Sequence, residues 1–151
     1  MEKFLHRAID LAIENVENGG TPYGAVLVKD GIIIGEGVNT LHQAYDVSGH
    51  AEMIAIREGQ QKLQTNDLSG CIIYASGHPC PMCLGAIGIT QIKHVYFANT
   101  VEEGAEVGLT ISGQIYDYLK GQKDRLDLKI EHIPIPVDDV DPMKLYAKKS
   151  R

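Results

Sequence analysis

Two short apolar runs separated by a segment of helical length constrain the fold of this chain more than any other feature of its sequence. The runs are Cys71–Ala75 and Val95–Ala98, and residues 81–90 lie between them. Uninterrupted apolar runs of this length are typical of strands that are covered on both faces. Because a helix that links two such strands indicates a βαβ unit, the sequence predicts an α/β fold.

An amphipathic helix and a hairpin are predicted ahead of this unit. Apolar residues recur at three- and four-residue spacing from Phe4 to Val16, which predicts a surface helix with one buried stripe. Apolar runs at 24–28 and 32–34 flank Asp30-Gly31, a pair that tolerates positive φ and predicts an antiparallel hairpin. The other predicted elements are a loop at 38–49, a helix at 50–63, a helix at 112–120 capped by Ser112, a weak strand at 126–133 and a terminal helix at 142–149.

Composition predicts a single globular domain that spans residues 1–151. The chain has 151 residues, of which 44% are hydrophobic and 23% charged, as expected for one ordinary globular domain. Helices on both faces of a mixed sheet of about five strands would give a three-layer α/β/α sandwich. At this length the core needs no metal for stability, so a metal bound here would serve chemistry.

Charge, hydropathy and cysteine content predict a soluble protein of the cytoplasm. The formal net charge is −6, which disfavours binding to nucleic acid through its phosphates. No apolar run approaches the roughly 20 residues that cross a bilayer, so no membrane association is expected. Three cysteines are too few for the disulfide framework of a small secreted domain.

Cys80 and Cys83 lie where the first strand of the βαβ unit gives way to its helix. The motif Pro79-Cys80-Pro81-Met82-Cys83 places two thiols three positions apart, on one face of the first helical turn. Free N–H groups and the positive end of the helix dipole favour the thiolate form there. The motif therefore predicts a metal site, while a redox pair and two ordinary thiols remain alternatives.

His50-Ala51-Glu52 opens the predicted helix at 50–63 and offers a third metal ligand. One histidine and two cysteines leave a fourth coordination position open, as a catalytic zinc requires and a structural zinc does not. A closed site would need a fourth protein ligand, for which the candidates are His42, His78, His94 and His132. Glu52 is predicted to face the same pocket without binding the metal, which leaves it able to move protons.

The order of these motifs resembles that of the cytidine deaminase superfamily of zinc-dependent nucleobase and nucleoside deaminases, which carry H-x-E followed by P-C-x-x-C. The resemblance covers the first two-thirds of the chain, in the stretches Pro22–Val28, Asn39, His50–Arg57 and Pro79–Ile87. Within the superfamily it is strongest to the small bacterial guanine deaminases, through residues 22–25, 55–57, 80–87 and 106–108, with the tRNA adenosine deaminases next.

The resemblance implies one Zn²⁺ ion per chain, held by His50, Cys80 and Cys83 with water in the fourth position. Glu52 is implied to be the general acid–base of a hydrolytic deamination that releases ammonia. The side chain of Asn39 and the backbone N–H of Ala51 are implied to contact the base. The implied enzyme is an aminohydrolase that acts on a cyclic amidine, in a free nucleobase or nucleoside of the guanine type, and forms a homodimer.

Two features depart from the pattern of the guanine deaminases. His78 stands before Pro79-Cys80, where the family often has glutamate; it is predicted to contact the substrate, and a loop histidine with a local hydrogen bond is its alternative. The segment 108–112 lacks the aspartate that helps those enzymes hold the purine, so only the hydroxyls of Thr110 and Ser112 remain there and the identity of the base stays open. Two C-terminal features are left without an assigned role, namely Tyr146, a candidate to close the pocket or to pack a terminal helix, and the basic tail of Lys144, Lys148, Lys149 and Arg151.

Three alternative functions remain at this stage. A tRNA adenosine deaminase would use the same zinc chemistry but must also grip an RNA loop, which the acidic charge disfavours. An enzyme for cytosine or another aminoheterocycle would differ in the size and polarity of its pocket. A noncatalytic zinc-stabilised interaction module would keep the fold and lack the activity.

Overall fold

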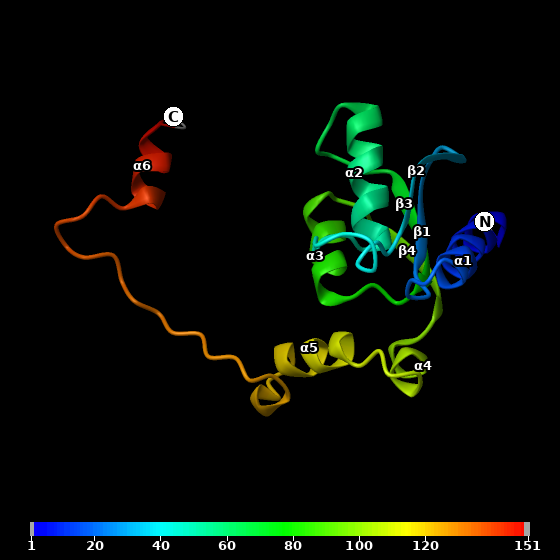
Figure 1. The fold of residues 1–151 in the computed structure, drawn as a ribbon. Coiled ribbons are helices and arrows are strands. Elements are labelled where there is room, and N and C mark those ends of the chain that lie inside the picture. Colours follow the sequence, from blue (N-terminus) through cyan, green and yellow to red (C-terminus); the bar gives the residue numbers. More distant parts are fainter. Residues whose placement is uncertain (1, 150–151) are drawn as a thin grey trace.

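The computed structural model describes residues 2–149, whose strands form one mixed sheet in the order β2-β1-β3-β4 (Figure 1). The strands are β1 (Gly24–Lys29), β2 (Ile32–Val38), β3 (Cys71–Gly77) and β4 (His94–Asn99). β1 pairs antiparallel with both β2 and β3, whereas β3 pairs parallel with β4. The predicted hairpin and the predicted parallel βαβ unit are therefore confirmed.

Helices cover both faces of this sheet. α1 (Glu2–Glu17) lies on one face, and α2 (Ala51–Leu63) and α3 (Pro81–Ile89) lie on the other, which gives three layers (Figure 1). Successive side chains of a strand point to opposite faces. Accordingly Val26 and Val28 of β1 are buried with apolar side chains of α1, while Leu27 belongs to the core beneath α2 and α3.

The prediction of a fifth strand is wrong for the part of the chain that the structure describes. Residues 126–133 pair with no strand among residues 2–149, and they run away from the sheet toward α6 (Pro142–Lys149) (Figure 1). Leu128 and Ile130 on this segment are 52% and 75% exposed. Alternating apolar residues give a segment the pattern of a strand, but a strand also needs an edge to pair with, and this segment leaves before it reaches the free edge of β4.

Two helices that follow β4 differ from the prediction. α4 (Val101–Glu106) has no counterpart in it; this helix begins with a capping box, in which the Thr100 hydroxyl accepts from Glu103 N and the Glu103 carboxylate accepts from Thr100 N. α5 (Ile111–Leu119) begins before Ser112, so Thr110 occupies the cap position and the predicted cap at Ser112 is wrong. The 3₁₀ turn η1 (Lys123–Arg125) follows.

No helix within residues 2–149 has both the length and the apolar character needed to cross a bilayer.

β2 and α2 approach each other so closely that glycine is required on the strand. A Cβ atom at Gly35 would overlap the carbonyl oxygen of Ala55, and one at Gly37 would overlap that of Ala51. These two oxygens are backbone atoms of α2, so they cannot move aside as a flexible side chain would. The contact therefore fixes the first turn of α2, which carries Glu52, against the sheet.

We predict that Gly35→Ala lowers the free energy of unfolding by about 1–3 kcal/mol, because the added methyl group must push α2 away from β2. Urea denaturation followed by circular dichroism measures the change. Gly88→Ala is the matched control, since a Cβ atom there meets nothing within 4 Å and alanine favours the helical backbone of α3. Equal stabilities for the two variants would contradict the proposed role of the close contact.

Candidate active site

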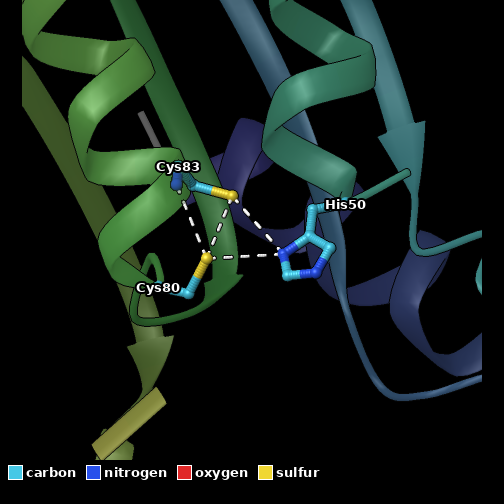
Figure 2. Close-up of side chains that lie close together, drawn as sticks. All are labelled: His50, Cys80 and Cys83. Carbon is cyan, nitrogen blue, oxygen red and sulfur yellow. Dashed lines mark hydrogen bonds between the residues drawn. The ribbon is translucent and has the colours of Figure 1, made fainter. Parts of the chain in front are cut away.

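The beginnings of α2 and α3 meet at one end of the sheet and bring three donor side chains together. His50 is the N-cap of α2, Cys80 is the N-cap of α3, and Cys83 lies in the first turn of α3. Pro81 fixes the backbone at the start of α3, and the Cys83 N–H lies 3.5 Å from Cys80 Sγ. Figure 2 shows the two sulfur atoms and the imidazole facing one another.

The distances among these donor atoms fit a tetrahedral zinc ion. His50 Nδ1 lies 3.4 Å from Cys80 Sγ and 3.6 Å from Cys83 Sγ, and the two sulfur atoms are 3.5 Å apart. Tetrahedral zinc with its usual bonds to sulfur and imidazole nitrogen would separate the donors by about 3.6–3.8 Å. Two thiols and one imidazole are also the donor types that zinc prefers. The three side chains can therefore hold zinc with little rearrangement.

The two thiols differ in their pKa. A hydrogen bond from Cys83, followed by the interaction with His50, lowers the pKa of the Cys80 thiol to about 4. The pKa of Cys83 is raised, chiefly because its thiol donates to Cys80 and because it is buried. The pair therefore supplies one thiolate readily, and a metal ion that binds both sulfurs must displace the proton of Cys83.

Glu52 provides a buried carboxyl group beside the donor atoms. It is the second residue of α2, and only 6% of its surface is exposed. Burial is the main cause that raises its pKa to about 7, and the nearby charge of Cys80 adds to the effect. A carboxyl group with such a pKa both takes up and releases a proton near neutral pH.

Asn39 and Ala51, the two predicted contacts to the base, carry polar groups in defined orientations. Asn39 is 4% exposed; its Oδ1 accepts a hydrogen bond from Leu41 N, and its backbone oxygen accepts one from Asn15 Nδ2. The turn that this side chain caps therefore uses its carbonyl and leaves its NH₂ group to donate to a ligand. Ala51 is fully buried as the first residue of α2, a position whose N–H has no acceptor within the helix.

His78, two residues before the donor Cys80, lies on the wall of a cavity. The cavity has a volume of about 370 Å³, and its lining includes Tyr23, His78, Glu106 and Ser112. The donor atoms themselves are not part of its wall. Burial first, and then the charges of Glu52 and Cys80, raise the pKa of Tyr23, so this tyrosine belongs to the surroundings of both the cavity and the carboxyl group.

Sequence reasoning missed Tyr23 and Tyr116 as functional candidates, and Tyr23 was present only as part of a family stretch. Ser112 was interpreted as a helix cap and also as a hydroxyl that could meet the base. The Ser112 hydroxyl is buried without a hydrogen-bond partner among residues 2–149, and it lines the cavity. Tyr116 donates from its hydroxyl to Pro79 O at 2.5 Å. Its sequence context carries no sign of this contact, because α5 reaches the metal loop only through the tertiary fold.

The chain matches the model of the cytidine and deoxycytidylate deaminase zinc-binding region over residues 1–99. It therefore belongs to this family. The predictions of a deaminase of this superfamily and of a zinc cofactor are confirmed, the second also by the donor cluster of His50, Cys80 and Cys83. The individual roles of these residues, and of Glu52, remain predictions.

Relatives that are named as deaminases include a guanine deaminase and a tRNA-specific adenosine deaminase. Guanine deaminase of Bacillus subtilis (strain 168) is 48% identical over 108 residues, which are 71% of this chain and 69% of that protein. The X-ray structure of guanine deaminase from Bacillus subtilis matches with a TM-score of 0.77 at 39% identity, covering 99% of this chain and 90% of that one. The tRNA-specific adenosine deaminase of Aquifex aeolicus (strain VF5) is 39% identical over 97 residues, 64% of each chain. A structure solved in complex with 2,6-diaminopurine matches with a TM-score of 0.66 at 27% identity, covering 70% of this chain and 59% of that one.

We predict that His50→Ala, Cys80→Ala and Cys83→Ala each reduce the zinc content from about one ion per chain to a small fraction, because two donors hold zinc far more weakly than three. Inductively coupled plasma mass spectrometry of the dialysed proteins measures the content. Cys71→Ala is the matched control, since Cys71 is a core residue of β3 with 2% exposure and lies outside the donor cluster. Zinc retained at full stoichiometry in any of the three variants would contradict that ligand assignment.

Proposed function

We propose that this protein is a zinc-dependent aminohydrolase that deaminates a free purine base of the guanine type and releases ammonia. The observation that carries the proposal is the placement of Glu52. Its carboxyl group is buried beside the three donor atoms, does not belong to the donor set, and has a pKa of about 7. A structural zinc site has no use for such a group, whereas hydrolysis needs a proton acceptor that later becomes a donor.

The residues of the site divide the chemistry among them. Zinc held by His50, Cys80 and Cys83 would supply a Lewis acid that brings the pKa of a water molecule close to neutrality. Glu52 would accept a proton from a water molecule and pass it to a ring nitrogen of the base, which opens the carbon that bears the amine to attack by the resulting hydroxide. It would then carry the proton of the added hydroxyl group to the amine, so that the C–N bond breaks, ammonia leaves and a carbonyl remains on the base.

Orientation of the base falls to the groups around Glu52. The NH₂ group of Asn39 donates to an acceptor on the base, because its carbonyl is already engaged by Leu41 N. The N–H of Ala51 offers a second donor at the start of α2. His78 contacts the side of the base that faces the adjoining cavity. Rigid donors of this kind hold the reacting carbon in place for attack.

Charge and sequence similarity favour a small substrate over tRNA. The net charge of −6 opposes the phosphates of an RNA loop, and the basic residues of the tail are confined to the end of the chain. Identity is also higher with the Bacillus subtilis guanine deaminase, at 48%, than with the Aquifex aeolicus tRNA-specific enzyme, at 39%. The tRNA reaction is therefore the alternative outcome of the test below.

The particular base depends on the cavity wall. Ser112 offers a hydroxyl in the segment where guanine deaminases resemble one another in carrying aspartate, and a neutral hydroxyl binds an N–H edge more weakly than a carboxylate does. Glu106 lines the same cavity from α4. These differences support the testing of guanine together with isoguanine, adenine, cytosine and other aminoheterocycles.

We further propose that the protein acts as a homodimer in the cytoplasm. Leu84 and Ile89 of α3 are 46% and 82% exposed, and Phe97 of β4 is 40% exposed. A second copy of the chain would cover exposed apolar side chains of α3 and β4. Sedimentation velocity, which separates a single chain from a pair, tests the dimer.

An ammonia-release screen of the zinc-loaded protein against these bases and their nucleosides tests the proposed reaction. We expect ammonia from guanine or a related purine base. Inosine formed only in tRNA would support the tRNA alternative instead. No ammonia from any substrate would contradict the proposal and favour a noncatalytic module.

We predict that Glu52→Gln lowers the turnover number about 100- to 10,000-fold while zinc remains bound, because the amide cannot accept and return the proton. The screen above measures the rate, and metal analysis measures the zinc. Glu58→Gln on the exposed side of α2 is the matched control and should keep the normal rate. Turnover of Glu52→Gln at the rate of the unmodified protein would remove Glu52 from the mechanism.

A further inference from the structure

We propose that Tyr116 is a positioning residue that fixes the ring of His78, so that His78 Nε2 accepts a hydrogen bond from an N–H group of the bound base. The inference rests on the proposed function and deepens it. It assigns the histidine that replaces the usual glutamate to substrate selection, and it names the side chain that makes this assignment work. The substrate class that follows is a free base with an N–H group on the side of the cavity.

The hydrogen bond of the His78 ring determines which of its nitrogens carries the proton. His78 Nδ1 lies 2.9 Å from Pro79 O. A backbone carbonyl only accepts hydrogen bonds, so Nδ1 must carry the proton. In the neutral ring Nε2 then has its lone pair free and acts as an acceptor.

Tyr116 and Phe97 hold the His78 ring in this orientation. The hydroxyl of Tyr116 donates to the same Pro79 oxygen at 2.5 Å. The Tyr116 ring also meets the His78 ring edge to face, with centroids 5.5 Å apart, and Phe97 does so at 4.7 Å. Burial raises the pKa of Tyr116 to about 12, which keeps its hydroxyl protonated. His78 is therefore held by two aromatic rings and by a carbonyl whose position Tyr116 fixes.

His78 and Ser112 present polar groups to a substrate in the cavity. His78 lines the cavity together with Tyr23 and Ser112, and the buried Ser112 hydroxyl has no hydrogen-bond partner within residues 2–149. A base that extends from the donor cluster into this cavity would meet an acceptor at His78 and a hydroxyl at Ser112. An N–H group satisfies the acceptor, whereas an N-methyl group or a ribose at that nitrogen leaves it unpaired and collides with the wall.

Nuclear magnetic resonance tests the tautomer independently of activity. In ¹⁵N-labelled, zinc-loaded protein, the long-range ¹H–¹⁵N pattern of His78 is identified by its disappearance in His78→Gln. We expect the tautomer with the proton on Nδ1. Tyr116→Phe removes only the hydroxyl and should shift the population toward a proton on Nε2, while Tyr118→Phe on the same helix should leave it unchanged. A proton on Nε2 in the unmodified protein, or no response to Tyr116→Phe, would overturn the proposal.

Kinetics test the consequence for selectivity. The base that the protein deaminates is compared with derivatives methylated at each ring N–H in turn, using kcat/KM. We expect kcat/KM to be about tenfold lower for one derivative than for the parent base. This ratio of the two kcat/KM values should be smaller in Tyr116→Phe and should fall to one in His78→Leu. The double variant should match His78→Leu alone, because Tyr116 acts through His78. Different discrimination in the double variant and in His78→Leu would show that Tyr116 acts independently of His78 and would overturn the proposal.

The two measurements separate the two proposals. If no base is deaminated, the proposed function fails, while the tautomer of His78 still decides the role of Tyr116. If a base is deaminated and the tautomer does not depend on Tyr116, the positioning role fails and the deaminase remains. All variants should retain one zinc ion per chain, because Tyr116 and His78 lie outside the donor cluster.

Discussion

The fold places the first turns of α2 and α3 against each other, and the whole site depends on that contact. The start of one helix places His50 and Glu52, and the start of the other places Cys80 and Cys83, three positions apart. The position of α2 is set by its backbone contact with β2 at Gly35 and Gly37, and that of α3 by the crossover from β3 to β4. Neither helix supplies a complete site alone, so activity requires the assembled sheet.

The same contact sets the electrostatics of the site. Helix N-termini present unpaired N–H groups and positive dipole ends, which favour thiolates and a bound base with acceptor groups. Glu52 is buried at one of these termini. Burial raises its pKa more than the hydrogen bond to its backbone lowers it, so the pKa is about 7. The arrangement therefore combines a thiol pair that could hold a metal ion with a carboxyl group whose pKa lies near neutrality.

Sequence patterns predicted those features that arise from local structure. The hairpin at Asp30-Gly31 and the βαβ unit follow from turn chemistry and apolar runs, and His50 joined the two cysteines because all three lie at helix starts. The burial of Cys71 fits the apolar run at 71–75 in which it lies. The prediction of a fifth strand was wrong because the alternating pattern at 126–133 does not indicate whether a sheet edge is available for pairing. The contact of Tyr116 with Pro79 was missed because the two residues are separated by 37 positions and meet only in the folded chain.

The central claim is that three side chains hold a zinc ion with one position left for water. A crystal structure of the zinc-loaded protein, with anomalous diffraction measured at the zinc edge, tests it most directly. The account predicts one peak at about 2.0–2.3 Å from His50 Nδ1, Cys80 Sγ and Cys83 Sγ, with a solvent oxygen as the fourth ligand beside Glu52. A peak away from these three atoms, or a fourth ligand supplied by the protein, would contradict it.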